Sequence, residues 1–128
     1  MIQKLVKKIF GTRSDREIKQ LYPIVDNINQ QAESLKNKTD EELRERSLEL
    51  RQDLINNRKK AEKNASNTFT DKDERTKFIL KKEHEKLEEI LPETFAMVKE
   101  TCIRMCGSNW SVAGRDQTWE MIPYDVQI

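Results

Sequence analysis

TDEELRERSLELRQDL, residues 39–54, opens with the pattern of a helix N-terminus and continues as an amphipathic helix. Thr39 followed by Glu42 is a capping box, in which each side chain binds the backbone N–H of the other residue. The apolar residues that follow share one stripe of this helix: Leu43, Leu50 and Leu54. The stretch therefore predicts a helix that begins at Thr39 and presents one apolar face to a partner.

The helical pattern returns after a polar connection, so residues 39–91 predict a long, charged helical hairpin. Apolar periodicity fades between Asn56 and Thr70, and the polar stretch around Asn64–Asn67 is the predicted turn. A second capping pattern begins at Thr70, and the apolar residues after it are Phe78, Ile79, Leu80, Leu87, Ile90 and Leu91. Basic and acidic side chains alternate throughout, which is typical of solvated helices that share one apolar seam.

Residues 14–35 predict a helix that needs a partner. A capping pattern runs from Ser14 to Glu17, and the apolar residues after it recur at spacings of three and four: Ile18, Leu21, Val25, Ile28, Ala32 and Leu35. Such a heptad seam packs against another helix. Pro23 lies inside the segment, so the helix either restarts there or kinks.

LPETFAMVKETCIRMCG, residues 91–107, predicts the best-buried helix of the chain. Pro92 suits the first turn of a new helix, and Gly107 suits its end. One face of this helix holds the predicted core residues Phe95, Val98, Cys102 and Met105. After it, a glycine-containing turn between Trp110 and Trp119 predicts a small β-hairpin.

The expected fold class is mainly α, with amphipathic helices, a charged helical hairpin, and a short β-hairpin followed by an extended C-terminal segment. The expected boundaries are an amphipathic helix at 1–10, a helical region at 14–107 that contains the hairpin, and a last part at 108–128. Only three glycines and three prolines occur in 128 residues, which favours long helices over barrels or sandwiches. The net charge of +1 argues against a dedicated nucleic-acid binder.

The chain has no recognisable catalytic or metal-binding motif. Its single histidine, His84, lies on the charged hairpin and is expected on a solvated helix face. Cys102 and Cys106 are one helical turn apart, but two further zinc ligands are missing, so both are expected to be reduced thiols on the core face. Neither a P-loop nor a dinucleotide-binding glycine motif occurs.

The first ten residues predict a short amphipathic helix that contacts anionic membranes. Its apolar stripe comprises Ile2, Leu5, Val6 and Ile9, with Phe10 beside it, and its basic side chains are Lys4, Lys7 and Lys8. An apolar face with lysines opposite suits a helix that lies in the headgroup region. The alternative is that this stripe packs only against the protein or a second copy.

Four segments in this order resemble the N-terminal region of the SecA family, the motor ATPases of bacterial preprotein translocation. They are KLVKKIFGTRSDREIKQL (4–21), TDEELRERSLELRQDL (39–54), LPETFAMVKETCIRMCG (91–107) and MIPYDVQ (121–127). The resemblance covers most of residues 1–55 and 88–107, together with 121–128. It implies the beginning of a longer protein, cut before the P-loop, in which residues 108–128 start the nucleotide-binding domain. The insertions at 56–87 and 110–120 have no assigned function.

In this family, the element that matches Y-D-V-Q resembles the Q motif of helicase-like motors, whose glutamine reads adenine. The resemblance places Gln127 in that role, with Tyr124 at the aromatic position and Met121 lining the same pocket. A carboxamide suits adenine because it carries a donor and an acceptor side by side. The role of Tyr124 is open, because its ring either stacks on adenine or packs in a core. The alternative to an adenine site is that Y-D-V-Q is simply the first strand of the motor domain.

The resemblance also implies cofactors and partners. The parent would use ATP and Mg²⁺, whereas the fragment alone is expected to bind no cofactor and to be inactive. Expected partners are the SecYEG channel, anionic phospholipid and preproteins, with a possible homodimer and no nucleic acid. The expected location is cytoplasmic, attached peripherally to the inner face of the cell membrane. The alternative function is a self-contained helical protein–protein interaction module that uses the seam of residues 18–35.

Overall fold

The structure is a computed structural model that describes residues 13–125 and 127, with side chains from Glu17 onward. Its described part contains three helices and one two-stranded antiparallel hairpin. The elements are α2 (Arg13–Leu35), α3 (Asp40–Thr68), α4 (Lys72–Met105), β1 (Asn109–Val112) and β2 (Arg115–Thr118). The mainly helical class with a small β-hairpin is therefore confirmed. The helix predicted over 1–10 lies outside the described residues.

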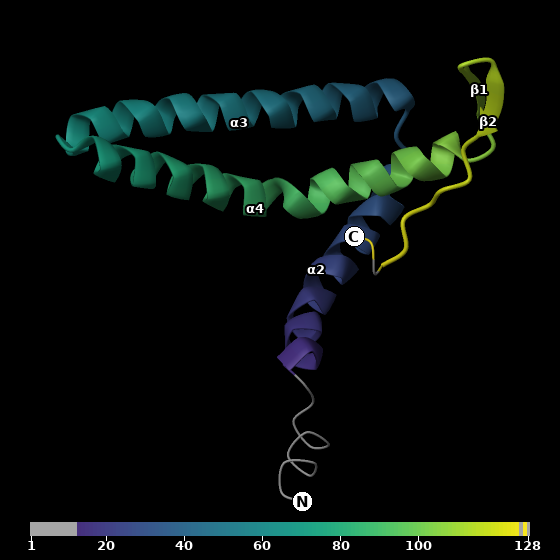
Figure 1. Ribbon diagram of the computed structural model, residues 1–128, viewed down its shortest axis with the longest axis horizontal. Helices are drawn as coiled ribbons and strands as arrows, with labels where there is room; N and C mark the ends of the chain where they lie inside the picture. The colour runs from purple at the N-terminus through teal and green to yellow at the C-terminus, as the bar shows by residue number, and fades with distance from the viewer. Residues whose placement is uncertain (1–12, 126, 128) are drawn as a thin grey trace, which may run out of the picture.

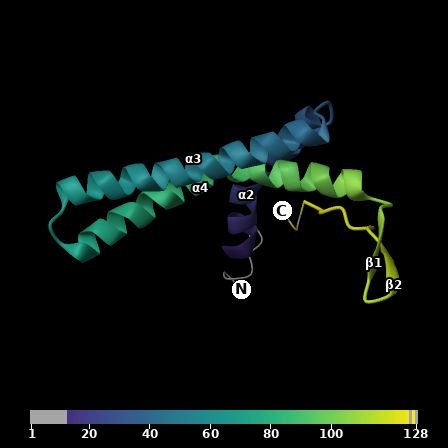
Figure 2. The ribbon, with the colours of Figure 1, turned by 90° about the horizontal axis from the view of Figure 1, so that it is seen from above.

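The helices α3 and α4 run antiparallel, side by side, and form the long arm of the molecule (Figure 1). Helix α2 leaves this arm at a steep angle and packs against α4. The β-hairpin follows the C-terminal end of α4, and the last residues run back beneath α4 toward α2, as the view from above also shows (Figure 2). The chain therefore brings its C-terminal segment close to its first described helix.

The predicted capping box at Thr39 is present. The backbone N–H of Glu42 donates to Thr39 Oγ1 at 3.2 Å, and the backbone N–H of Thr39 donates to Glu42 Oε2 at 2.7 Å. The bond from the Thr39 backbone lowers the pKa of Glu42. This reciprocal pair fixes the start of α3, as the sequence predicts.

The predicted hairpin turn at Asn64–Asn67 is wrong. Helix α3 continues through these residues to Thr68, and the turn consists of the next three residues, 69–71. The reason is that Ala61 and Ala65 are buried on the seam with α4, where small side chains let the two helices approach closely. A search for large apolar residues at helical spacing overlooks such an alanine seam.

The cap of α4 is Asp71, whereas the sequence placed it at Thr70. Asp71 Oδ1 accepts hydrogen bonds from the backbone N–H groups of Asp73 and Glu74, both at 2.9 Å. The rings of Phe69 and Phe78 lie 5.5 Å apart and close the end of the hairpin. The turn is therefore tight and partly packed.

The two prolines inside predicted helical segments do not break them. Pro92 was expected to start a new helix, but α4 runs without interruption from Lys72 to Met105. Pro23 lies inside α2, which is also unbroken, so the restart considered there does not occur. Proline removes one helical hydrogen bond, and in α4 the packing of α3 and α2 on the same helix offsets that loss.

The core consists of two clusters on α4. Leu43, Leu50, Ile90 and Met97 form the cluster between α3 and α4, whereas Ile28, Ala32 and Ala96 form the cluster between α2 and α4. The α2 seam is therefore only half used: Ile28 and Ala32 are buried, but Ile18 and Leu21 are exposed. Leu35 contacts both clusters and joins them.

The core face predicted for the C-terminal half of α4 is largely wrong. Cys102 is buried, but Phe95, Val98 and Met105 are exposed, and Cys106 is also exposed. The reason is that α4 packs against two helices at once, so the face that includes Ala96, Met97 and Glu100 points inward. Both cysteines are free thiols.

The β-hairpin has the turn expected of a two-residue connection. Its central residues, Ala113 and Gly114, both have positive φ angles, of 51° and 76°. Positive φ at both positions matches the right-handed twist of the flanking strands. The rings of Trp110 and Trp119 lie 6.0 Å apart beside the paired strands.

Candidate functional site

The structure folds the end of the Y-D-V-Q element into a turn closed by two hydrogen bonds. The backbone N–H of Gln127 donates to the carbonyl of Tyr124 at 2.8 Å. The backbone N–H of Tyr124 donates to Gln127 Oε1 at 2.9 Å. The carboxamide of Gln127 is therefore held against the backbone of its own turn. Its oxygen still has a second lone pair, and its nitrogen carries two N–H donors.

This turn is attached to the helices through Asp125. Asp125 Oδ1 accepts hydrogen bonds from Asn29 Nδ2 on α2 at 3.1 Å and from Lys99 Nζ on α4 at 3.2 Å. Lys99 Nζ also donates to Asn29 Oδ1 at 2.6 Å. The three side chains thus form a closed triangle, here called the Asp125 anchor, which joins three distant parts of the sequence.

The electrostatics of the Asp125 anchor favour the charged carboxylate. The hydrogen bond from Asn29 is the main cause that lowers the pKa of Asp125, and the bond from Lys99 adds to it. The Asn29 amide fits in one orientation only, because its oxygen must face the ammonium and its NH₂ must face the carboxylate. The Lys99 side chain is only 17% exposed, which limits its competing contacts with water.

The structure joins two of the three predicted adenine-site residues in one turn. Tyr124 and Gln127 share the turn, and the Tyr124 residue is 75% exposed, so its ring is not packed in the described core. Met121 is exposed, and its carbonyl accepts from Trp119 Nε1 at 2.7 Å. The predicted membrane-contacting residues, Ile2, Lys4, Leu5, Val6, Lys7, Lys8, Ile9 and Phe10, lie outside the described residues.

The sequence reasoning missed Asn29, Lys99 and Asp125. Asp125 could have been recognised as a candidate, because it lies inside the Y-D-V-Q element that pointed to Gln127. Asn29 directly follows a seam position, and Lys99 lies one position before the buried Glu100. The sequence shows that Asn29 is a polar residue at the edge of an apolar seam. It does not show that its hydrogen-bond partner, Asp125, lies 96 residues further along the chain.

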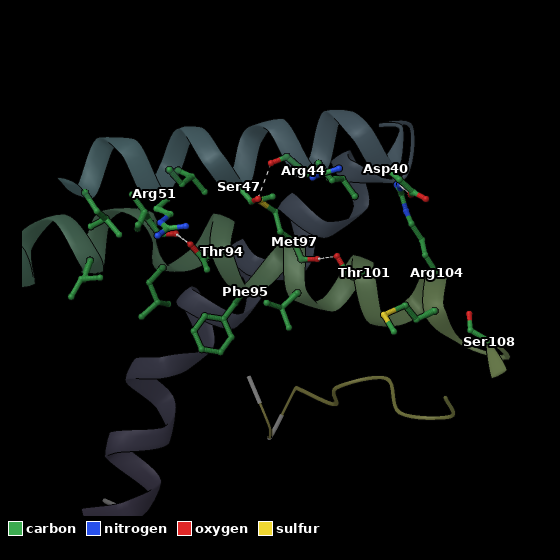
Figure 3. A pocket seen from close by; sticks show the side chains of 18 residues that line it. Asp40, Arg44, Ser47, Arg51, Thr94, Phe95, Met97, Thr101, Arg104 and Ser108 are labelled. Atoms are coloured by element: carbon green, nitrogen blue, oxygen red, sulfur yellow. Dashed lines mark hydrogen bonds and ion pairs between the residues drawn. The ribbon is translucent and has the colours of Figure 1, made fainter. Parts of the chain in front are cut away.

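An apolar groove also runs between α3 and α4. Its volume is about 950 Å³, and its lining includes the exposed residues Phe95, Val98 and Met105. Arg104 crosses one end, where its Nη1 donates to Asp40 Oδ1 at 2.7 Å (Figure 3).

The described residues, 13–125 and 127, offer neither a metal-binding cluster nor a membrane-spanning helix. No group of three or more His, Cys, Asp or Glu side chains in this part of the chain is arranged to hold a metal ion. No helix in the same part is long and apolar enough to cross a membrane. His84 lies on an exposed face of α4, where its Nε2 is 3.2 Å from Glu88 Oε1.

The described architecture is thus a helical segment that ends in an anchored, glutamine-bearing turn. The family model described as the SecA DEAD-like domain matches residues 6–128. The chain therefore belongs to the SecA family.

Curated relatives agree with this assignment. The chain is 40% identical to a protein translocase subunit SecA of Chloroherpeton thalassium, 37% to that of Chlorobaculum tepidum and 35% to that of Chlorobium phaeovibrioides. Each alignment covers 98% of this chain and 14% of the relative, so the chain spans about one seventh of the relatives' length. The comparison with solved structures found no match.

Proposed function

We propose that this chain is part of an ATP-driven SecA-type preprotein translocase and that its Tyr124–Gln127 turn supplies the adenine-reading end of the nucleotide site. Family membership supports the class of motor. The observation that carries the site is the pair of hydrogen bonds between Tyr124 and Gln127, because it holds a carboxamide in one orientation on an exposed turn.

The proposed recognition uses both ends of the Gln127 carboxamide. Its Oε1 accepts from the exocyclic amino group of adenine through its second lone pair, and its Nε2 donates to the neighbouring ring nitrogen. Guanine presents a carbonyl in place of that amino group, so the same geometry opposes GTP. The exposed Tyr124 ring is available to stack on the base, and Met121 adds apolar lining.

The phosphates and Mg²⁺ of ATP belong to another part of the proposed motor. Phosphoryl transfer requires a phosphate-binding loop with its lysine and a hydroxyl on the metal, and no P-loop motif occurs in these 128 residues. The contribution proposed for this chain is therefore selection of the base. The larger subunit supplies the chemistry.

The proposal extends to the setting in which SecA-type motors work. Residues 1–10 contact anionic phospholipid and the SecYEG channel, preproteins are the substrates, and the motor associates peripherally with the cytoplasmic face of the membrane. A homodimer is part of the same proposal. The alternative of a self-contained helical interaction module has no support in the relatives, which are all named as translocase subunits.

Nucleotide preference tests the proposed site. In a complete SecA-type subunit that carries this segment, Gln127→Ala should weaken ATP binding and reduce the preference for ATP over GTP, a loss of about 1–3 kcal/mol. Gln117→Ala is the matched control, because Gln117 is exposed on β2 and has no part in the turn. Unchanged ATP and GTP affinities in Gln127→Ala would contradict the proposal.

A further inference from the structure

We infer that Lys99 and Asn29 are positioning residues for nucleotide selection, acting on Gln127 through Asp125. The inference rests on the proposed adenine-reading role of Gln127. The two side chains do not touch the base in this scheme. They fix the turn that presents Gln127, so they determine whether its carboxamide reaches adenine in the correct orientation.

The first argument is the convergence of contacts on one atom. Asp125 Oδ1 receives one hydrogen bond from α2 and one from α4, at 3.1 and 3.2 Å. Lys99 and Asn29 are themselves joined at 2.6 Å, so neither donor can move without disturbing the other. Two helices that pack on each other through Ile28 and Ala96 therefore supply a rigid base for the anchor.

The second argument is that little else holds the turn. Tyr124, Asp125 and Gln127 are all exposed, so burial of these three side chains does not hold them against the described helices. The two hydrogen bonds inside the turn set its shape but not its place in the molecule. Among the described residues, the side-chain hydrogen bonds of Asp125 tie the turn to α2 and α4.

The third argument is the position of Asp125 within the turn. It lies between Tyr124 and Gln127, the residues joined by the two internal hydrogen bonds. A displacement of its backbone therefore displaces the Gln127 carboxamide as well. Hydrogen bonds are short and directional, so a small displacement is enough to lose a paired contact with a base.

The test compares ATP and GTP affinities in a complete SecA-type subunit that carries this segment. Lys99→Met removes the donor to both Asn29 and Asp125, and should reduce the ATP-over-GTP preference about three- to tenfold. Lys99→Arg keeps a cationic donor and should restore much of the preference. Lys36→Met is the matched control. Lys36 and Lys99 both line a small hollow between α2 and α4, but Lys36 pairs with Glu33 at 2.7 Å.

The pattern of affinities separates positioning from a general structural role. Loss of positioning lowers ATP affinity selectively, whereas a general loss of structure weakens both nucleotides together and would overturn the inference. Asp125→Ala provides a second variant, because it removes the acceptor of both anchoring hydrogen bonds at an exposed residue. It should shift the preference in the same direction even if Lys99→Met folds poorly.

Gln127→Ala, measured alongside, distinguishes the two proposals. If Gln127→Ala loses the adenine preference while both Lys99→Met and Asp125→Ala keep it, the positioning role is overturned and the proposed site stands. If Gln127→Ala keeps the preference, the proposed site falls and the positioning role falls with it. Loss of preference in all three variants, with Lys36→Met unchanged, supports the inference.

Discussion

Arg46 of α3 and Glu93 of α4 form a bidentate ion pair across the helical hairpin. Arg46 Nε donates to Glu93 Oε1 at 2.6 Å, and Arg46 Nη2 donates to Glu93 Oε2 at 2.9 Å. Two parallel bonds between planar groups fix direction as well as distance. Because Glu93 directly follows Pro92, the pair ties α3 to α4 beside the position where proline weakens α4.

The first prediction concerns this pair. A double-mutant cycle with Arg46→Met and Glu93→Gln should give a coupling free energy of about 0.5–1 kcal/mol, because both partners are partly solvated. The hydrogen bond from Arg46 lowers the pKa of Glu93 below its ordinary value of 4.5. The coupling should therefore be complete above that value and disappear as the pH falls through the lowered pKa. Urea unfolding at several pH values measures it.

Arg44→Met is the control for the loss of one positive charge from α3, since Arg44 is exposed and lines the groove on the same helix. It should show little coupling with Glu93→Gln at any pH. A coupling between Arg46 and Glu93 that stays constant down to pH 2 would contradict the ion-pair interpretation.

The second prediction concerns the packing of α2 against α4. Ile28 is 1% exposed and Ile24, one turn earlier, is 41% exposed. Ile28→Ala should destabilise the fold by about 2–5 kcal/mol, because it leaves a cavity beside Ala32 and Ala96. Ile24→Ala should cost about 1 kcal/mol or less. Thermal unfolding followed by circular dichroism compares them, and equal losses would contradict the observed face of α2.

Sequence reasoning predicted the elements of this fold well where the signal was local. The capping box at Thr39 and the glycine-containing turn of the β-hairpin depend on neighbouring residues alone, and both are present. The leucine stripe of α3 also packs as predicted, with Leu43 and Leu50 buried. Each of these features follows from the local sequence, without knowledge of the partner element.

The errors arise where packing against another helix determines which residues are buried and where a helix ends. The exposure of Phe95 and Val98 follows from how α4 rotates to meet two helices, and the apolar period of one helix cannot show that rotation. The hairpin turn lies later in the chain than predicted, because the buried Ala61 and Ala65 extend the seam of α3. Alanine gives only a weak periodic signal in the sequence. Packing therefore overrode local expectation in each of these places.

The sequence predicted only the local part of the candidate site. The Y-D-V-Q element and its resemblance to SecA pointed to Gln127 and Tyr124, which share a turn in the structure. The anchor formed by Asn29, Lys99 and Asp125 joins residues up to 96 positions apart, so its members were not recognisable one at a time. Long-range polar contacts of this kind require the fold.

The third prediction concerns the tip of the helical hairpin. Asp71→Ala should destabilise the N-terminus of α4 by about 1 kcal/mol, because it removes the acceptor for two backbone N–H groups. Thr70→Ala is the matched control at the adjacent position, where the sequence had placed the cap, and it should have a smaller effect. Amide hydrogen exchange at Asp73 and Glu74 gives the local readout. A larger effect from Thr70→Ala would contradict the observed cap.

The fourth prediction concerns residues 1–10, whose apolar stripe and three lysines predict reversible binding to anionic membranes. Each lysine near an acidic leaflet contributes about 1 kcal/mol, and the cost of ordering a helix too short to be stable alone opposes this gain. Binding should therefore be weak, should require anionic lipid, and should fall as salt screens the charges. Flotation of the 128-residue chain with vesicles of anionic or zwitterionic phospholipid measures it.

Charge reversal and deletion separate this mechanism from packing of the same stripe against protein. Changing Lys4, Lys7 and Lys8 to glutamate should abolish flotation with anionic vesicles at low salt, and deletion of residues 1–10 should do the same. Changing Lys59, Lys60 and Lys63 to glutamate is the matched control, because these exposed lysines of α3 carry equal charge on the hairpin. If the hairpin variant loses binding while the N-terminal variant keeps it, the membrane contact lies on α3 and residues 1–10 are not the anchor.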